Sequence, residues 1–246
     1  MNAPRPSLGA ARAADAAASG AGAPARAGGS RAAGSGRSAQ DKRRLILDAA
    51  VRVFARQGFH SCRVSDIADE AGVAYGLVYH YFDSKDEVLD TIFLERWNVM
   101  LDLIREVDAR PGNVRDKLGE IASFIVESYR HDPDVMKVII VEVTRAANSF
   151  GNTHIGTIRE AYDLIGGMIA KAQADGTFKP DIEARFAAMA FYGVIEQLLT
   201  GWIFDLLPQG AEEFEKAKTI VVETVCGGLE IAVVSDGTTP GNTLPR

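Results

Sequence analysis

Apolar residues recur at intervals of three and four positions along most of the chain, which places them on one face of a helix. Between residues 41 and 58, for example, Ile46, Val53 and Phe54 share one face and most basic residues lie elsewhere. Runs of β-branched residues with period-two alternation are scarce. The pattern therefore predicts an all-α fold.

Glycine, proline and short polar stretches interrupt this periodicity and divide it into nine expected helices. Their approximate ranges are 41–57, 64–71, 74–82, 84–108, 114–131, 134–148, 154–175, 181–206 and 211–233. Ser84 and Glu87 have the spacing of a capping box at the start of the fourth helix. We expect residues 39–89 to form an N-terminal domain of three helices, and residues 90–233 to form a C-terminal helical domain.

The two ends of the chain have a different composition. Residues 1–38 consist mainly of Ala, Gly, Ser, Pro and Arg with almost no large apolar side chains, so we expect a disordered arm. It contains five arginines and a single acidic residue, Asp15. The arm is either a solvated tail or a cationic segment that grips DNA phosphates or the minor groove. Residues 234–246 are polar and turn-rich and are expected to form a disordered tail.

Composition favours a folded, cytoplasmic protein. Apolar residues make up 47% of the 246 residues. Cys62 and Cys226 suggest neither a disulfide framework nor a metal site, and no signal peptide pattern opens the chain. Residues 186–204 approach the length of a membrane span, but Glu196 would cost roughly 2.5–3.5 kcal/mol in mid-membrane. We therefore expect a buried helix there.

Charge is distributed unevenly along the chain. Residues 1–85 carry 12 Lys or Arg against 7 Asp or Glu, a net charge of +5, whereas the remaining residues carry 15 against 26, a net charge of −11. The sum is the overall charge of −6. Neutralisation of DNA phosphates requires a basic surface, and the N-terminal part supplies it.

Residues 58–89 contain a short helix, a glycine turn and a second short helix rich in aromatic side chains. This is the layout of a helix-turn-helix, with the motif at about residues 63–82, whose second helix enters the DNA major groove. Gly72 is expected to adopt the left-handed conformation in the turn. A purely structural use of the aromatic side chains is the alternative.

The stretch resembles the DNA-binding signature of the TetR repressor family. The shared motifs, in order, are Ile67-Ala68, Ala71-Gly72-Val73, Tyr79 to Phe82 and Ser84-Lys85. The resemblance implies a homodimer that binds a pseudo-palindromic operator in double-stranded DNA. It also implies DNA contacts at matching positions, which are Arg63, Ser65, Tyr75, Gly76, Leu77, Tyr79, His80 and Lys85.

Several positions in this stretch depart from the family pattern, among them Tyr75, where the family often has a polar side chain. Arg63 replaces the usual Thr and cannot cap the helix in the same way, and Ala74 loses a cap worth about 1 kcal/mol. Leu77 offers no hydrogen bond to a base, so we hypothesise a contact with a thymine methyl group. Replacing operator thymines with uracil tests this hypothesis, and unchanged affinity at every position removes it.

The resemblance assigns dimerisation to the helices at 181–206 and 211–233. The expected interface residues are Phe186, Met189, Ile195, Leu199, Trp202, Val222, Val225 and Leu229. An intrachain core is the alternative for the same side chains. A dimer interface and an intrachain core can both be present, on different faces of these helices.

The resemblance also implies an effector cavity in the C-terminal domain. Its candidate lining residues are Trp97, Met100, Ile104, Phe124, Ile139, Glu142, Arg145, Ile165, Met168 and Tyr192. The local sequences at residues 131–135 and 193–202 are similar to those in the branch of the family that responds to fatty acyl-CoA. Long acyl chains are therefore the expected effector, with the helix at 84–108 transmitting occupancy to the DNA-binding domain.

Other functions remain open at this point. A regulator of an efflux or catabolic operon would sense a different hydrophobic ligand, and a constitutive DNA-binding protein would sense none. An enzyme is disfavoured because the four histidines have no metal-ligand spacing and no nucleophile motif or phosphate-binding loop is present. We expect no catalytic residues, no metal and no cofactor.

Overall fold

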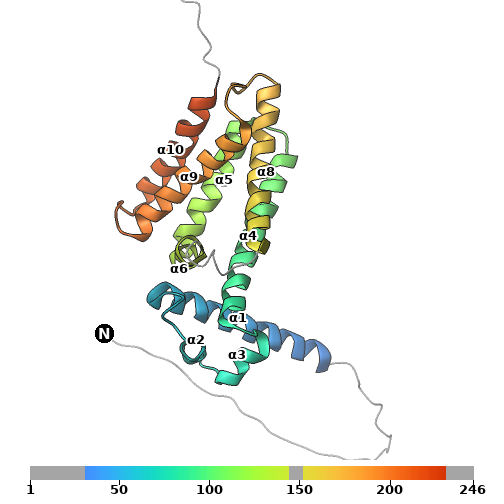
Figure 1. Cartoon of the computed structure of the whole chain (residues 1–246), viewed down its shortest axis with the longest axis vertical. Helices are drawn as coiled ribbons and strands as arrows, with labels where there is room; N and C mark the ends of the chain where they lie inside the picture. Colours follow the sequence, from blue (N-terminus) through green and yellow to red (C-terminus); the bar gives the residue numbers. More distant parts are fainter. Residues whose placement is uncertain (1–30, 144–151, 231–246) are drawn as a thin grey trace, which may run out of the picture. The chain divides into compact units, whose positions relative to one another are not determined.

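The computed structural model describes residues 31–143 and 152–230, and these residues are helical with short connecting loops (Figure 1). The all-α prediction is confirmed. The described residues from Asp41 onward form one compact unit, and those before Asp41 belong to a separate unit. The predicted tail at residues 234–246 lies outside the described residues.

The N-terminal helices are α1 (Arg31–Gln57), α2 (Val64–Ala71) and α3 (Tyr75–Tyr81), followed by the long α4 (Lys85–Ala109). α1 begins inside the segment that we expected to be disordered. Its first residues include Ala, Arg and Gln, which favour helix, and extending an existing helix costs less than nucleating one. The expected arm is corrected accordingly, and residues 1–30 lie outside the described residues.

The C-terminal helices are α5 (Val114–His131), α6 (Pro133–Lys137), the π-helix η1 (Val138–Val143), α8 (Asn152–Ala174), α9 (Ala184–Ile203) and α10 (Ala211–Leu229). We expected one continuous helix over 134–148. In the structure α6 runs directly into η1, so the described part of this range is one helical stretch whose second half is a π-helix. Residues 144–148 of that prediction lie outside the described residues.

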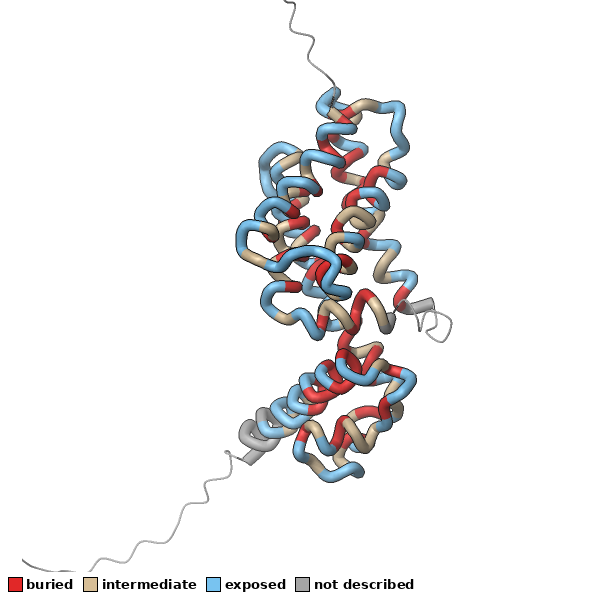
Figure 2. The backbone as a smooth tube through the Cα atoms, turned by 90° about the vertical axis from the view of Figure 1, so that its left-hand side faces the viewer, coloured by how far each residue is buried: buried red, intermediate tan, exposed pale blue. Residues whose placement is uncertain are grey.

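The C-terminal helices pack through their apolar faces. α8 lies against α9 and α4, α10 lies against α5 and α9, and α4 also contacts α5. Figure 2 shows buried and exposed positions alternating along each helix, as amphipathic helices require. Phe93, Ile121 and Phe191 are among the largest fully buried side chains.

α9 is long and apolar enough to cross a membrane by length and composition alone. In the structure it is packed between α8 and α10, and Ala188, Phe191 and Ile195 are fully buried. Glu196 lies on the same helix, and burial raises the pKa of its carboxyl group. These contacts are those of a core helix of the helical domain.

α4 runs without interruption from the helix-turn-helix into the C-terminal domain. Its first turn begins at Ser84, whose hydroxyl accepts a hydrogen bond from the backbone N–H of Glu87 at 3.0 Å. This confirms the Ser84 half of the predicted capping box, whereas the Glu87 carboxylate accepts from the N–H of Asp83 instead of Ser84. Val88 and Leu89 near this end are fully buried, as is Ile104 near the other. α4 thus contributes buried side chains at both of its ends.

Candidate DNA-binding and effector-binding sites

The turn between α2 and α3 is set by Gly72, which has φ 65° and ψ 32°. This confirms the predicted left-handed conformation. A Cβ at this position would meet no atom within 4 Å, so backbone conformation rather than space requires glycine. The turn brings Ile67 of α2 and Val78 of α3 into the buried core.

α2 is also fixed to α1 by a charged contact. The Glu70 carboxylate accepts hydrogen bonds from Arg52 at 2.7 Å and from Arg56 at 3.1 Å. The hydrogen bond from Arg52, and then that from Arg56, lowers the pKa of Glu70 below its ordinary value. Two arginines of the basic N-terminal part are thus used to position α2.

α3 presents its aromatic side chains to solvent. Tyr75 is 53% exposed and Tyr79 is 44% exposed, and Gly76 and His80 are exposed beside them. The hydroxyls of Tyr75 and Tyr79 share a hydrogen bond of 3.1 Å, which raises the pKa of Tyr79. One hydroxyl proton of the pair remains available for a phosphate oxygen. Leu77 is only partly exposed.

The residues before α2 and α3 behave as the sequence suggests. Arg63 is exposed and its side chain makes no cap, while the Asp66 carboxylate accepts a hydrogen bond from the Arg63 N–H at 2.7 Å. Ala74 likewise provides no side-chain cap to α3. Ser65 is half-buried at the start of α2. The Arg63 side chain is therefore accessible from solvent at the start of α2.

Lys85, which is one of the predicted phosphate contacts, also makes contacts within the chain. Its Nζ donates to the carbonyl of Phe59 at 2.5 Å and to that of Cys62 at 2.9 Å, and it lies 4.5 Å from the centre of the Phe59 ring. The ammonium thus ties α4 to the loop that precedes Arg63. Sequence spacing did not reveal this role because the acceptors lie 23 and 26 positions away.

The C-terminal domain contains a cavity of about 290 Å³ between α4, α5, α6, η1 and α9. Most of its lining is apolar. Five of the predicted lining residues are present, namely Trp97, Met100, Phe124, Ile139 and Tyr192. Burial raises the pKa of the Tyr192 hydroxyl, which therefore stays protonated.

The other predicted lining residues do not line this cavity. Ile104, Ile165 and Met168 are buried in the helical core instead, and the prediction is corrected for these three. Their helical positions face the interior, but neighbouring side chains fill the space around them. The side chain of Glu142 and the whole of Arg145 lie outside the described residues.

Sequence reasoning missed the polar side chains of the cavity. They are Arg96, Glu127, Ser128, His131 and Asp132. One signal was available, because Glu127, Ser128 and His131 follow Phe124 at three, four and seven positions and so share its helix face. Arg96 directly precedes Trp97 and carried no such signal.

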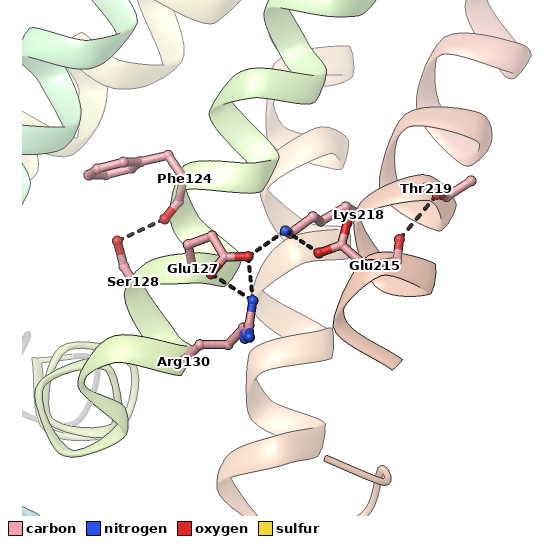
Figure 3. A network of polar contacts seen from close by, with 7 residues as sticks. All are labelled: Phe124, Glu127, Ser128, Arg130, Glu215, Lys218 and Thr219. Carbon is pink, nitrogen blue, oxygen red and sulfur yellow. Dashed lines mark hydrogen bonds and ion pairs between the residues drawn. The ribbon is translucent and has the colours of Figure 1, made fainter. Parts of the chain in front are cut away.

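The carboxylate of Glu127 belongs to a network between α5 and α10 (Figure 3). It accepts a hydrogen bond from Arg130 at 2.9 Å and another from Lys218, which also donates to Glu215 at 2.7 Å. The hydrogen bond from Lys218 lowers the pKa of Glu127. This acidic residue of the cavity is therefore already neutralised by cations.

The predicted dimer residues fall into two groups. The side chains of Ile195, Leu199, Trp202, Val225 and Leu229 are buried inside the single chain, so they form its own core and the interface prediction is narrowed. Phe186 is 66% exposed and Met189 is 48% exposed, and Val222 is half-buried. Only these three of the predicted residues have surface for a partner.

The fold and its two sites define a class of protein. An exposed recognition helix on a helix-turn-helix, joined by α4 to a helical domain with an apolar cavity, is the architecture of a ligand-responsive DNA-binding regulator. The family described as "Bacterial regulatory proteins, tetR family" matches residues 46–92, and "YsiA-like protein, C-terminal region" matches residues 93–209. The chain belongs to the tetR family of transcriptional regulators.

Individual relatives are similar over most of the folded chain. The fatty acid metabolism regulator protein of Bacillus subtilis is 29% identical over 161 residues, covering 65% of this chain and 82% of that protein. The fatty acid degradation regulator FadR of Bacillus halodurans has a TM-score of 0.66 at 25% identity, covering 74% and 94%. FadR of B. subtilis in complex with stearoyl-CoA shares the fold, with a TM-score of 0.64 at 24% identity, covering 75% and 97%.

Proposed function

We propose that this regulator is a dimeric repressor that a hydrophobic effector, such as a fatty acyl-CoA, releases from a pseudo-palindromic operator. The observation that carries the proposal is the apolar cavity of about 290 Å³ against α4. α4 is the helix that also forms part of the DNA-binding core. A ligand in this cavity contacts the element that positions the recognition helix.

The DNA-binding part of the proposal is supported by exposure and charge. Tyr75, Tyr79 and His80 project from α3 with polar atoms that suit phosphate oxygens. Arg63 adds an exposed cation before α2. Because a single unit of this size buries little surface, two copies are needed for specific binding.

The effector class is supported by the chemistry of the cavity. Trp97, Phe124, Ile139 and Met136 provide an apolar wall on which an acyl chain packs without unpaired polar groups. The volume of about 290 Å³ lies just below the roughly 300–1,000 Å³ that is typical of ligand pockets. Two of the relatives carry names that refer to fatty acid metabolism or degradation.

The proposed dimer uses the exposed side of α9. Phe186, Met189 and Ala190 are exposed at helical spacing and are followed on the same side by Gln197. Such a stripe of apolar surface favours association with a second copy. Replacing Phe186 with Glu is expected to shift the protein towards monomers in sedimentation equilibrium, whereas an unchanged dimer would place the interface elsewhere.

The proposed release mechanism is a linkage between the two sites. A ligand that favours one position of α4 changes the spacing of the two recognition helices, and DNA affinity falls by the corresponding coupling free energy, typically about 1–3 kcal/mol. The ion pair between Arg43 of α1 and Glu95 of α4, at 2.7 Å, is one contact through which a displacement of α4 reaches α1.

The proposal is tested with a duplex selected from a random-sequence library by binding to the purified protein. Fluorescence anisotropy then measures affinity for this duplex at increasing concentrations of acyl-CoAs with eight to eighteen carbons. We expect nanomolar-range binding that at least one acyl-CoA weakens by about 5- to 150-fold. Duplex binding that no acyl-CoA changes would leave a DNA-binding protein with a different effector or none.

A further inference from the structure

The charged side chains around the cavity differ in how far they are already engaged. Both acidic residues have partners. Glu127 is bound by Lys218 and Arg130, and the Asp132 carboxylate accepts a hydrogen bond from the Val135 N–H at 3.0 Å at the start of α6. Both carboxylates are thus already used by the fold, Glu127 by two cations and Asp132 as a helix cap through one of its oxygens.

The basic residues around the cavity are not engaged in this way. Arg96 and His131 line the cavity, and both are exposed. Neither makes a hydrogen bond or an ion pair within residues 38–141 and 154–230, the part of the chain whose side chains the structure describes. The neighbouring Glu95 is instead paired with Arg43 of α1. Among the described side chains, the charge at the cavity that has no ion-pair partner is therefore the positive charge of Arg96.

Arg96 also lines a second, much smaller hollow between α4 and α1. This hollow has a volume of about 20 Å³ and includes Arg44, Leu47 and Asp48 of α1. It holds one water molecule at most. The Asp48 carboxylate lies 3.5 Å from Arg44 in the same hollow. One side chain of α4 thus borders both the effector cavity and a helix of the DNA-binding domain.

We propose that Arg96 binds the anionic group of an amphipathic effector whose apolar part occupies the cavity. This inference rests on the proposed function and narrows its effector to an acyl compound with a carboxylate or phosphate group. A guanidinium suits both groups because its planar N–H donors form paired hydrogen bonds with two oxygens. An anion that draws Arg96 towards the cavity withdraws it from the α1 hollow, so occupancy reaches the DNA-binding domain through the same residue.

The test compares ligands that share a twelve-carbon chain. Isothermal titration calorimetry measures binding of dodecanoate, dodecanoyl-CoA and the neutral dodecanol to wild-type protein and to Arg96→Gln, which removes the charge. We expect wild type to bind at least one anionic ligand about tenfold more tightly than dodecanol, and Arg96→Gln to lose this preference while its dodecanol affinity stays unchanged. Arg159→Gln is the matched control, because Arg159 is exposed on α8 and lines neither hollow.

The pattern of binding separates the possible failures. A preference lost for dodecanoate identifies a carboxylate as the bound group, and one lost for dodecanoyl-CoA identifies a phosphate; both support the assignment. Wild-type binding without a preference for anions, or a preference that Arg96→Gln retains, would overturn the role of Arg96 alone. If wild type binds none of the three compounds, the acyl effector itself is wrong and the role of Arg96 falls with it.

Discussion

The DNA-binding domain and the C-terminal domain use their apolar residues in opposite ways. In the former, Ile67 and Val78 fill a small core so that polar and aromatic groups project outwards from α3. In the latter, apolar side chains surround a cavity of about 290 Å³, and ion pairs such as Arg105–Asp102 lie on the exterior. The outer face of α3 is thus suited to contact DNA, and the lining of the cavity is suited to enclose a small ligand.

The comparison indicates where each function is vulnerable. The recognition surface depends on a few side chains whose loss leaves the core intact. The cavity is empty space, so a larger side chain in its lining fills it and prevents ligand binding. Shortening a side chain in the neighbouring core instead lowers the free energy of unfolding. The predictions below separate binding from stability in each domain.

The largest effect is expected from the double change Tyr75→Phe and Tyr79→Phe. It removes the shared hydroxyl hydrogen bond and the proton available to a phosphate, at roughly 1.5 kcal/mol for each recognition helix. For the two recognition helices of the proposed dimer this corresponds to about a hundredfold weaker operator binding, measured by anisotropy. Thermal stability should not change because both rings are exposed. Tyr81→Phe is the control, since the Tyr81 ring packs against the core; an equal loss there would contradict the assignment.

Filling the cavity is expected to have the next largest effect. Ile139→Trp places additional atoms in the cavity and should weaken acyl-CoA binding at least tenfold while operator binding persists without its ligand response. Ile104→Val provides the contrast, because Ile104 is fully buried outside the cavity. That change should lower the free energy of unfolding by about 0.5–1.5 kcal/mol and leave ligand affinity unchanged. Calorimetry measures both quantities, and the reverse pattern would place the ligand elsewhere.

Alanine substitutions at Gly72 and Gly76 distinguish an effect on backbone strain from an effect on DNA binding. Gly72→Ala should lower the free energy of unfolding by about 1–2 kcal/mol, because its φ of 65° disfavours any side chain. Gly76→Ala on α3 meets no atom within 4 Å and should be neutral or stabilising by up to about 1 kcal/mol. It should nevertheless weaken operator binding if Gly76 approaches DNA. Thermal denaturation and anisotropy report the two effects separately.

The smallest expected effect concerns acid stability. Because hydrogen bonds from Arg52 and Arg56 lower the pKa of Glu70 in the folded state, its contribution is complete above the unfolded pKa of about 4.3. The contribution is lost as the pH falls through the lower folded-state pKa. Glu70→Gln should therefore reduce the pH dependence of unfolding below about pH 4. A variant with the wild-type acid profile would show that this contact adds nothing to the stability of α2 on α1.

The sequence predicted the DNA-binding domain more completely than the cavity. Gly72 and Ser84 act within three residues of themselves, so short motifs identify their turn and cap. The exposed aromatic side chains of α3 likewise follow from one helix of seven residues. Local spacing contains the necessary physical information in these cases.

The rest depends on which distant segments meet. Helical spacing places Ile165 and Met168 on an inward face, but only the packing of α8 against α9 and α4 decides that they lie in solid core. Lys85 and Arg96 both belong to α4, yet Lys85 is held by loop carbonyls and Arg96 lines the cavity. The burial of Trp202 also depends on partners elsewhere in the chain, Tyr129 and Phe214.

The coupling between the two domains is tested most directly by reciprocity. Equilibrium linkage requires that operator DNA weakens effector binding by the same factor by which the effector weakens operator binding. We predict that the affinity for an active acyl-CoA, measured by calorimetry, falls about 5- to 150-fold when the protein is saturated with operator duplex. An acyl-CoA that binds the free and the operator-bound protein equally well would contradict the account.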